Sequence, residues 1–329
     1  MIWIKSQSDN PEVTDYYLHV IGDAYKKSGF DVGYFKNWNE IQINKDDYIV
    51  VSNHREALKM ALTRKKYIYW VQGIIPEEDY AKFKKMWRKK ALELIENYSI
   101  NKAKFVIFVS KRMKSHYESK YGVRCNNNYV MPCNNDIFHV EGFQGKDKYR
   151  KNVFCYAGGL DVWQCFEETL QIYKDIEDRY NDVSLLLLVK DKKYAQNLVD
   201  KYNIKNCAID FVPVEQLPRK LSTVKFGFLI RDDLELNRVA TPTKLMTYIG
   251  NGVIPILSDC LEGLIENLEE TDYLVTVNQK KELCNLDSFI KKDIDINKIH
   301  SQYKAIYDNH YNREKHITEL FKVLPKPIR

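Results

Sequence analysis

Short apolar runs rich in β-branched and aromatic residues alternate with segments of helical periodicity along almost the whole sequence. Six such runs in the first half predict strands, at 1–5, 32–35, 48–52, 67–72, 105–110 and 129–132. Six more follow in the second half, at 153–157, 185–189, 208–212, 226–230, 254–257 and 273–277. Strands that alternate with helices in this way predict parallel sheets that are covered on both faces.

The segments between these strands predict helices. In the first half they are 14–27, 55–64, 77–97 and 111–121, and in the second half 162–180, 194–202, 215–222, 242–250 and 262–269. Thr14 and Ser110 are the expected N-caps of two of these helices, and Gly29 and Gly122 fall directly after helix ends. From 286 to 322 the pattern is helical, with no further strand.

The alternation pauses at 133–152, a polar segment with two glycines that we interpret as an interdomain linker. We therefore expect two Rossmann-like, doubly wound α/β domains, at 1–145 and 146–305, that face each other across a cleft. Residues 306–329 are expected to form a C-terminal helix that packs back on the first domain. Ligands of such sheets bind outside the carboxyl ends of the strands, so the cleft is the expected active site.

Composition narrows the class of protein. The chain has 329 residues and a net charge of +6, which is too weakly basic for a nucleic-acid-binding surface but suits a phosphorylated substrate. Its seven cysteines form no C-x-x-C pair and are expected to be buried free thiols of a cytoplasmic protein. The start of the sequence is too polar for a signal peptide, and no apolar run is long enough to cross a membrane.

Residues 226–259 contain the most informative pattern. A buried strand is followed by Arg231, then a polar loop leads through Pro242, Thr243 and Lys244 into a helix. Proline is favourable at a helix start, and the unpaired N–H groups of the first turn bind anions. We expect these residues to bind a diphosphate, against the alternative of an ordinary strand–loop–helix unit with solvated basic side chains.

The same stretch resembles the donor-binding segment of GT-B glycosyltransferases, in particular those similar to glycosyltransferase family 4 that build bacterial surface polysaccharides. The matching residues are Asn237, the run Val-Ala-Thr-Pro-Thr-Lys at 239–244, the pair Thr247-Tyr248 and the return strand Gly-Val-Ile-Pro-Ile at 252–256. The resemblance adds Asn237 to the expected donor site.

Other segments extend the resemblance over roughly 48–260. Gly158 and Gly159 follow a strand and let the backbone approach a diphosphate closely, although a plain tight turn is the alternative. Lys190 ends another strand and could meet phosphate, and Val212 and Val214 lie where the family binds the nucleotide base. Trp163-Gln164 stand in place of the usual basic residues. Pro132, Asn134 or Asn135, Asp136 and Phe138 resemble the segment that precedes the domain hinge.

Three segments of the first domain are candidates for acceptor binding. His54 follows a strand and is a possible acid or base, or only a structural histidine. Gln72 and Gly73 lie where the family carries His-Gly, and the glutamine could orient a sugar hydroxyl. Glu77 and the neighbouring Glu78 begin a helix, where acceptor binding and simple stabilisation of the helix start are the two interpretations.

The resemblance implies transfer of a hexose from a UDP- or GDP-linked sugar to a glycan or lipid-linked glycan, in capsule, O-antigen or similar biosynthesis. It favours retention of the anomeric configuration and implies no metal and no further cofactor. The two glutamates of the family would fall near Val239 and Thr247, and neither is acidic. Glu235, or Asp232 and Asp233, could replace them; alternatively, the chain is a catalytically impaired protein that binds nucleotide-sugars.

Two other classes are less consistent with the sequence. A dehydrogenase would need the G-x-G-x-x-G fingerprint, and no glycine follows the first strand. A periplasmic type of binding protein would need an export signal.

The segment 82–90 carries six Lys and Arg residues beside an apolar face formed by Phe83, Trp87, Ala91, Leu94, Ile95 and Tyr98. It is either a docked helix with a solvated basic face or a peripheral contact with the anionic inner surface of the cell membrane.

Overall fold

The computed structural model describes residues 1–6, 11–134, 137–145, 147–290 and 293–326. Asn135 and Asp136 of the expected hinge segment therefore lie outside the described residues. The chain divides into two compact units. The first unit comprises Met1–Cys133, Val239–Thr241 and Asn309–Arg329, and the second unit comprises Asn134–Arg238 and Pro242–Asp308.

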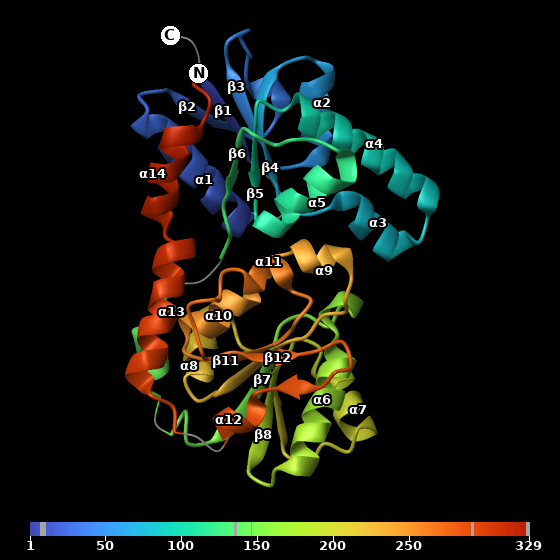
Figure 1. The fold of residues 1–329 in the computed structure, drawn as a ribbon, viewed down its shortest axis with the longest axis vertical. Helices are drawn as coiled ribbons and strands as arrows, with labels where there is room; N and C mark the ends of the chain where they lie inside the picture. The colour runs from blue at the N-terminus through green and yellow to red at the C-terminus, as the bar shows by residue number, and fades with distance from the viewer. Residues whose placement is uncertain (7–10, 135–136, 146, 291–292, 327–329) are drawn as a thin grey trace. The chain divides into compact units, whose positions relative to one another are not determined.

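A six-stranded parallel sheet forms the centre of the first unit (Figure 1). Its strand order is β2-β1-β3-β4-β5-β6, and the order reverses between β1 and β3. The strands are β1 (Ile2–Lys5), β2 (Val32–Phe35), β3 (Tyr48–Val51), β4 (Lys66–Val71), β5 (Phe105–Phe108) and β6 (Asn128–Val130).

Helices follow nearly every strand of this sheet. They are α1 (Pro11–Lys27), η1 (Trp38–Glu40), α2 (His54–Leu62), α3 (Ile75–Phe83), α4 (Met86–Lys102), α5 (Lys111–Tyr121) and the C-terminal α14 (Arg313–Val323). Helix α14 packs against α1. The Arg313 guanidinium pairs with Asp23 there, and the Tyr25 hydroxyl donates to the Pro325 carbonyl at 3.0 Å.

A seven-stranded sheet in the order β13-β12-β11-β10-β7-β8-β9 forms the centre of the second unit. All neighbours are parallel except β12 and β13. The order reverses between β7 and β10, which is the switch point of a Rossmann-type sheet. The strands are β7 (Asn152–Ala157), β8 (Val183–Leu188), β9 (Cys207–Asp210), β10 (Phe226–Leu229), β11 (Ile254–Ser258), β12 (Val275–Val277) and β13 (Leu283–Cys284).

The helices of the second unit are mostly short. They are η2 (Val140–Phe143), η3 (Val162–Gln164), α6 (Phe166–Arg179), α7 (Lys192–Lys201), η4 (Val214–Gln216), α8 (Leu217–Leu221), α9 (Glu235–Val239), α10 (Lys244–Gly250), α11 (Glu262–Ile265), α12 (Leu286–Ile290) and α13 (Ile296–His310). Part of the segment 133–152, which we predicted to be a polar linker, is packed into this unit. Lys148 is buried, and its ammonium donates to the carbonyls of Leu221 at 2.7 Å and Asn251 at 2.9 Å.

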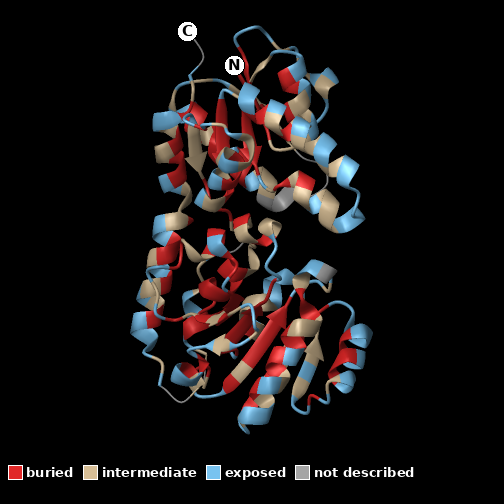
Figure 2. Cartoon of the chain, turned by 45° about the vertical axis from the view of Figure 1, so that its right-hand side comes forward, coloured by how far each residue is buried: buried red, intermediate tan, exposed pale blue. Residues whose placement is uncertain are grey.

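Burial explains why the strands could be predicted. Strands β3, β5, β10 and β11 are buried at every position, as expected for sheets that are covered on both faces. Figure 2 shows the central strands mostly in the colour of buried residues, whereas edge strands such as β2, β6 and β9 are only partly buried and many exposed positions lie on the helices. The expected Rossmann-like α/β architecture is confirmed for both units.

Several helix boundaries differ from the prediction. Helix α1 begins at Pro11, so Thr14 lies within it and is not its N-cap. The segment 77–97 forms two helices, because Lys84 takes a left-handed conformation with φ of 54° and ends α3. Cys165, with φ of 49°, interrupts 162–180 in the same way. Helix α10 begins at Lys244 and has only seven residues, so Pro242 precedes it.

Candidate functional site

A cavity of about 350 Å³ opens in the second unit at the carboxyl ends of β7, β8 and β9. Helix α10 closes one side of it. The cavity gathers seven residues that we predicted for the donor site: Gly158, Gly159, Lys190, Val212, Val214, Thr243 and Lys244. The other lining residues are Ala157, Leu188, Phe211, Leu217, Thr247 and Tyr248.

The backbone at Gly158 requires glycine. Its φ is +144°, a conformation that side chains rarely adopt, and an added Cβ would lie 2.8 Å from the Lys244 Nζ. The amide N–H of Gly158 donates to the Leu188 carbonyl at 3.1 Å, which fixes the turn at the end of β7. The Lys244 ammonium also lies 4.1 Å from the centre of the Tyr156 ring. The glycine thus provides the space in which Lys244 reaches the cavity.

Lys244 and Arg231 share one partner, the side chain of Gln164. The Arg231 Nη2 donates to the Gln164 Oε1 at 2.7 Å, and the Lys244 Nζ donates to the same oxygen at 3.4 Å. Burial, with the neighbouring positive charge of Arg231, lowers the pKa of Lys244 to about 7. Among the described residues, neither cation has a carboxylate within ion-pair distance, so this corner of the unit is electropositive and suited to an anion.

The Arg231 guanidinium is itself held by the protein. It is buried, and its Nη1 donates to the carbonyl oxygens of Ile230 at 2.8 Å and Gln164 at 3.3 Å. Arg231 does not line the cavity of about 350 Å³; it lines a neighbouring one of about 160 Å³, together with Asp232, Asp233 and residues of the loops after β11 and β12.

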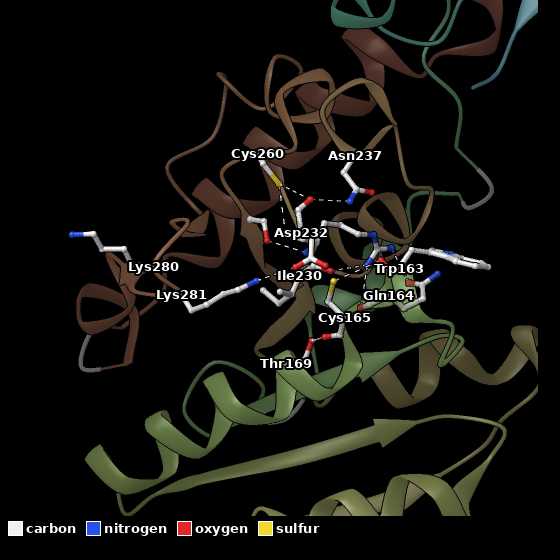
Figure 3. Close-up of polar contacts among 12 residues, drawn as sticks. Trp163, Gln164, Cys165, Thr169, Ile230, Asp232, Asn237, Cys260, Lys280 and Lys281 are labelled. Carbon is white, nitrogen blue, oxygen red and sulfur yellow. Dashed lines mark hydrogen bonds and ion pairs between the residues drawn. The ribbon is translucent and has the colours of Figure 1, made fainter. Parts of the chain in front are cut away.

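Three other predicted residues lie outside both cavities. The Asn237 amide donates to the Asp232 carbonyl at 2.8 Å, and Figure 3 shows Asn237 and Cys260 directed at the main chain of Asp232. Glu235 is the first residue of α9 and is partly exposed, and Pro242 accepts at its carbonyl from the Leu245 N–H before α10. Of the alternative acids, Asp233 forms an ion pair with Arg238 at 2.6 Å.

A second cavity, of about 320 Å³, lies in the first unit at the carboxyl ends of β3 and β4. It brings together His54, Gln72 and Gly73 with Ser52, Asn53, Tyr69, Ile75 and Glu78. Burial, with a smaller effect of the Arg55 charge, lowers the pKa of His54, so this imidazole is neutral near pH 7. Burial raises the pKa of Glu78. Among the described residues, its lining contains no lysine or arginine.

Glu77 lies outside this cavity. Its carboxylate pairs with Lys120 at 2.7 Å and with Lys89 at 3.4 Å. Burial alone would raise the pKa of Glu77, but the hydrogen bond and charge of Lys120 lower it below the usual range. The neighbouring Glu78 is the glutamate that faces the cavity, because adjacent residues of a helix start point in different directions.

Sequence reasoning did not assign Gln164, Phe211 or Thr247 to a site. Gln164 had a usable signal, because the buried Arg231 and the half-buried Lys244 on neighbouring elements require an acceptor between them. Phe211 directly follows β9 and is exposed at the cavity beside the exposed Val214, and two adjoining apolar side chains at a strand end were the signal that could have placed it there. Within the described residues, no group of His, Cys, Asp and Glu side chains is arranged to hold a metal ion.

No protein-family model matches the sequence, and no curated protein matches it either. Solved structures do resemble the chain. The crystal structure of the Anabaena protein HepE in complex with UDP and glucose is 13% identical, with a TM-score of 0.66 over 98% of each chain. The apo form of the lipopolysaccharide outer core galactosyltransferase WaaB is 12% identical, with a TM-score of 0.66 over 98% of each chain.

Sucrose-phosphate synthase from Thermosynechococcus elongatus is 12% identical, with a TM-score of 0.60 over 98% of this chain and 94% of that one. Likeness at this level of identity establishes the fold. The chain has the GT-B fold of these glycosyltransferases, as the sequence resemblance predicted.

Proposed function

We propose that this protein is a glycosyltransferase that moves a sugar from a UDP-linked donor to a hydroxyl of a glycan or lipid-linked glycan. The observation that supports this most strongly is the cavity of the second unit. It combines a glycine turn, an apolar end and the Lys244 ammonium, which has no carboxylate partner among the described residues. A nucleoside diphosphate has the complementary parts: a flat base, a ribose and two phosphates.

In this proposal the diphosphate lies beside Gly158, Gly159, Thr243 and Lys244. The Arg231 guanidinium, which donates to the Gln164 side chain, adds positive charge near the diphosphate without contacting it. The sugar–phosphate bond breaks with negative charge collecting on the diphosphate, and the fixed positive charges stabilise that leaving group. Lys190 would meet the phosphates from the end of β8.

The base would occupy the apolar end of the same cavity. Phe211, Val212, Val214 and Leu217 lie together there. The exposed Phe211 ring offers a face on which a pyrimidine can stack. HepE was solved in complex with UDP-glucose and with UDP and glucose. These complexes support UDP over GDP as the donor nucleotide.

The acceptor would bind in the cavity of the first unit. The described lining residues offer hydroxyl, amide, imidazole and carboxyl groups but no lysine or arginine, which favours a neutral sugar hydroxyl over a phosphorylated acceptor. We assign His54 and Gln72 to orienting that hydroxyl, since the neutral imidazole of His54 can accept its proton in a hydrogen bond. We propose retention of the anomeric configuration, which NMR of the product's anomeric proton would test.

The outer-core galactosyltransferase WaaB shares the fold. This supports a place for the enzyme in the synthesis of bacterial surface polysaccharide, such as capsule or O-antigen, with a hexose as the transferred group.

A thermal-shift screen of UDP, GDP, CMP and their common sugars tests the donor assignment. We expect UDP and one UDP-sugar to raise the melting temperature, because a ligand that binds only the folded state stabilises it. Lys244→Met should reduce the shift strongly. Lys193→Met, an exposed lysine on α7 outside the cavity, should retain it. No shift with any nucleotide would contradict the proposal.

One observation favours a second candidate, a protein that binds nucleotide-sugars without transferring the sugar. No carboxylate is among the described residues that line the donor cavity, and Thr247 lies there at the position where the resemblance places a glutamate. Release of UDP from the bound UDP-sugar, measured with and without glycan acceptors, separates the two. Binding without any release would favour the second candidate.

A further inference from the structure

The helices α3 and α4 form a hairpin that extends away from the sheet of the first unit (Figure 1). Only Lys84 and Lys85 connect them. Helix α4 packs on α2 and α3 through its inner side, where Glu96, Ser99 and Ile100 are buried. The hairpin is therefore a firmly held element with one outer side.

The outer side of α4 carries large apolar residues that remain exposed to solvent in the described part of the chain. Trp87 is 69% exposed and Leu94 is 72% exposed, and they lie seven residues apart on one face of the helix. Tyr98 extends the same face, while Phe83 and Met86 are exposed at the turn of the hairpin. The sequence pattern allowed a docked helix here, and the structure contradicts that interpretation for this face.

Positive charge surrounds these side chains. Two basic residues of the hairpin are neutralised: Arg88 pairs with Asp79 at 2.5 Å, and Lys89 pairs with Glu77 at 3.4 Å. Four others are exposed and have no ion pair with a carboxylate of the described chain: Lys82, Lys84, Lys85 and Lys90. We call these four lysines, with Phe83, Met86, Trp87, Leu94 and Tyr98, the hairpin surface.

We propose that the hairpin surface binds an anionic lipid bilayer. Tryptophan and tyrosine are the residues that favour the boundary between headgroups and acyl chains, and a row of aromatic and aliphatic side chains can enter that boundary. Unneutralised lysines beside them attract the anionic headgroups. No helix of the described chain is long and apolar enough to cross a membrane, so the contact would be peripheral.

The charge argues for lipid rather than for a protein partner. A stable protein interface usually has few lysines at its centre, whereas here lysines lie between and beside the apolar side chains. The proposal goes beyond sugar transfer and does not depend on it, because lipid binding and nucleotide binding are measured separately.

Sedimentation of the full chain with vesicles tests the proposal. We use vesicles of phosphatidylcholine alone and vesicles of equal parts phosphatidylcholine and phosphatidylglycerol. The protein should sediment with the anionic vesicles and remain largely in solution with the neutral ones. Trp87→Ser with Leu94→Ser, and separately Lys84→Glu with Lys85→Glu, should each weaken partition into the anionic vesicles by about tenfold or more.

Matched controls come from the same unit. Leu62→Ser removes an apolar side chain that is 64% exposed on α2, and Lys36→Glu with Lys45→Glu makes the same change of net charge away from the hairpin. Both should leave vesicle binding within about twofold. Far-UV circular dichroism and the melting temperature without ligand, measured for every variant, verify that each is folded.

Three results would overturn the proposal. They are no binding to anionic vesicles, equal losses in the controls, and a self-associated wild type that Trp87→Ser with Leu94→Ser converts to a monomer. The last result would identify the hairpin surface as an interface between copies of the chain.

Discussion

The charge of Lys244 changes near neutral pH, because burial and the Arg231 guanidinium lower its pKa to about 7. A diphosphate bound beside the ammonium favours the charged form and so raises this pKa. We expect the affinity for UDP to be highest below pH 7 and to fall by up to about tenfold per pH unit above it, as free Lys244 loses its proton. Isothermal titration calorimetry at several pH values measures this. The Lys244→Met variant should bind UDP more weakly, and its affinity should change less with pH.

The lowered pKa of Lys244 also predicts how the stability of the protein depends on pH. An ordinary lysine has a pKa of 10.5, so between about 7 and 10.5 the unfolded chain binds a proton that the folded chain lacks, and stability rises with pH. Below pH 7 the folded protein holds the half-buried, poorly hydrated charge of Lys244, which has no carboxylate partner among the described residues. Lys244→Met should therefore melt about 2 °C or more above wild type at pH 6, and this advantage should shrink as the pH rises. An advantage independent of pH would contradict the titration of Lys244.

Gly158 provides a steric test of the donor cavity. Gly158→Ala places a Cβ against the Lys244 ammonium and forces a side-chain residue into a φ of +144°. We expect a loss of about 1 kcal/mol or more of stability and a clear loss of UDP affinity, measured by thermal unfolding and calorimetry.

Gly159→Ala is the matched control for that substitution. The added Cβ there would meet only the Asp161 carboxylate, at 3.2 Å, and the backbone carries no left-handed strain. Equal effects of the two substitutions would mean that the cavity does not depend on the space around Lys244.

The sequence predicted correctly that residues directly after strand ends line the donor cavity. It was less successful for residues whose position at the site depends on the direction of the side chain. Gly158, Lys190 and Val212 line one cavity because parallel strands bring their carboxyl ends to the same edge of a sheet. The side chains of Arg231 and Asn237 instead bond to nearby main chain, and that choice follows from packing that no local pattern records.

Among the secondary-structure elements, both ends of α5 were predictable, because a capping serine begins this helix and a glycine ends it. Ser110 caps α5 by accepting from the Met113 N–H at 3.0 Å, and Gly122 ends the same helix with φ of 63°, both as predicted. The breaks at Lys84 and Cys165 were not predictable, because a left-handed residue other than glycine leaves no mark in the sequence. The hairpin surface results from one of these breaks.

The cap of α5 can be tested directly. Ser110→Ala removes, at a buried site, both the acceptor for the Met113 N–H and the donor to the Val239 carbonyl at 2.8 Å, so we expect a loss of about 1 kcal/mol or more of unfolding free energy. Ser115→Ala, an exposed position in the same helix, should leave stability unchanged or raise it slightly. Chemical denaturation of both variants checks this, and equal losses would show that the cap contributes nothing.

For the whole molecule, the alternation of strands and helices predicted two parallel-sheet units, and the observed strand orders agree with Rossmann-type sheets. The family resemblance predicted GT-B, which the solved structures confirm as the fold. Substrate identity does not follow from either source, because one fold serves many substrates and the choice is made by side chains at the cavities.

Hydrogen exchange over the full chain distinguishes the roles of the two units. If the second unit holds the donor, UDP should slow amide exchange in the segments that line its cavity, at 157–159, 188–190, 211–217 and 243–248. Segments 52–54 and 69–78, which line the cavity of the first unit, should exchange as before. Lys244→Met should remove the protection. Protection by UDP confined to the first unit would reverse the assignment of donor and acceptor, because bound nucleotide slows exchange where it restricts opening of the backbone.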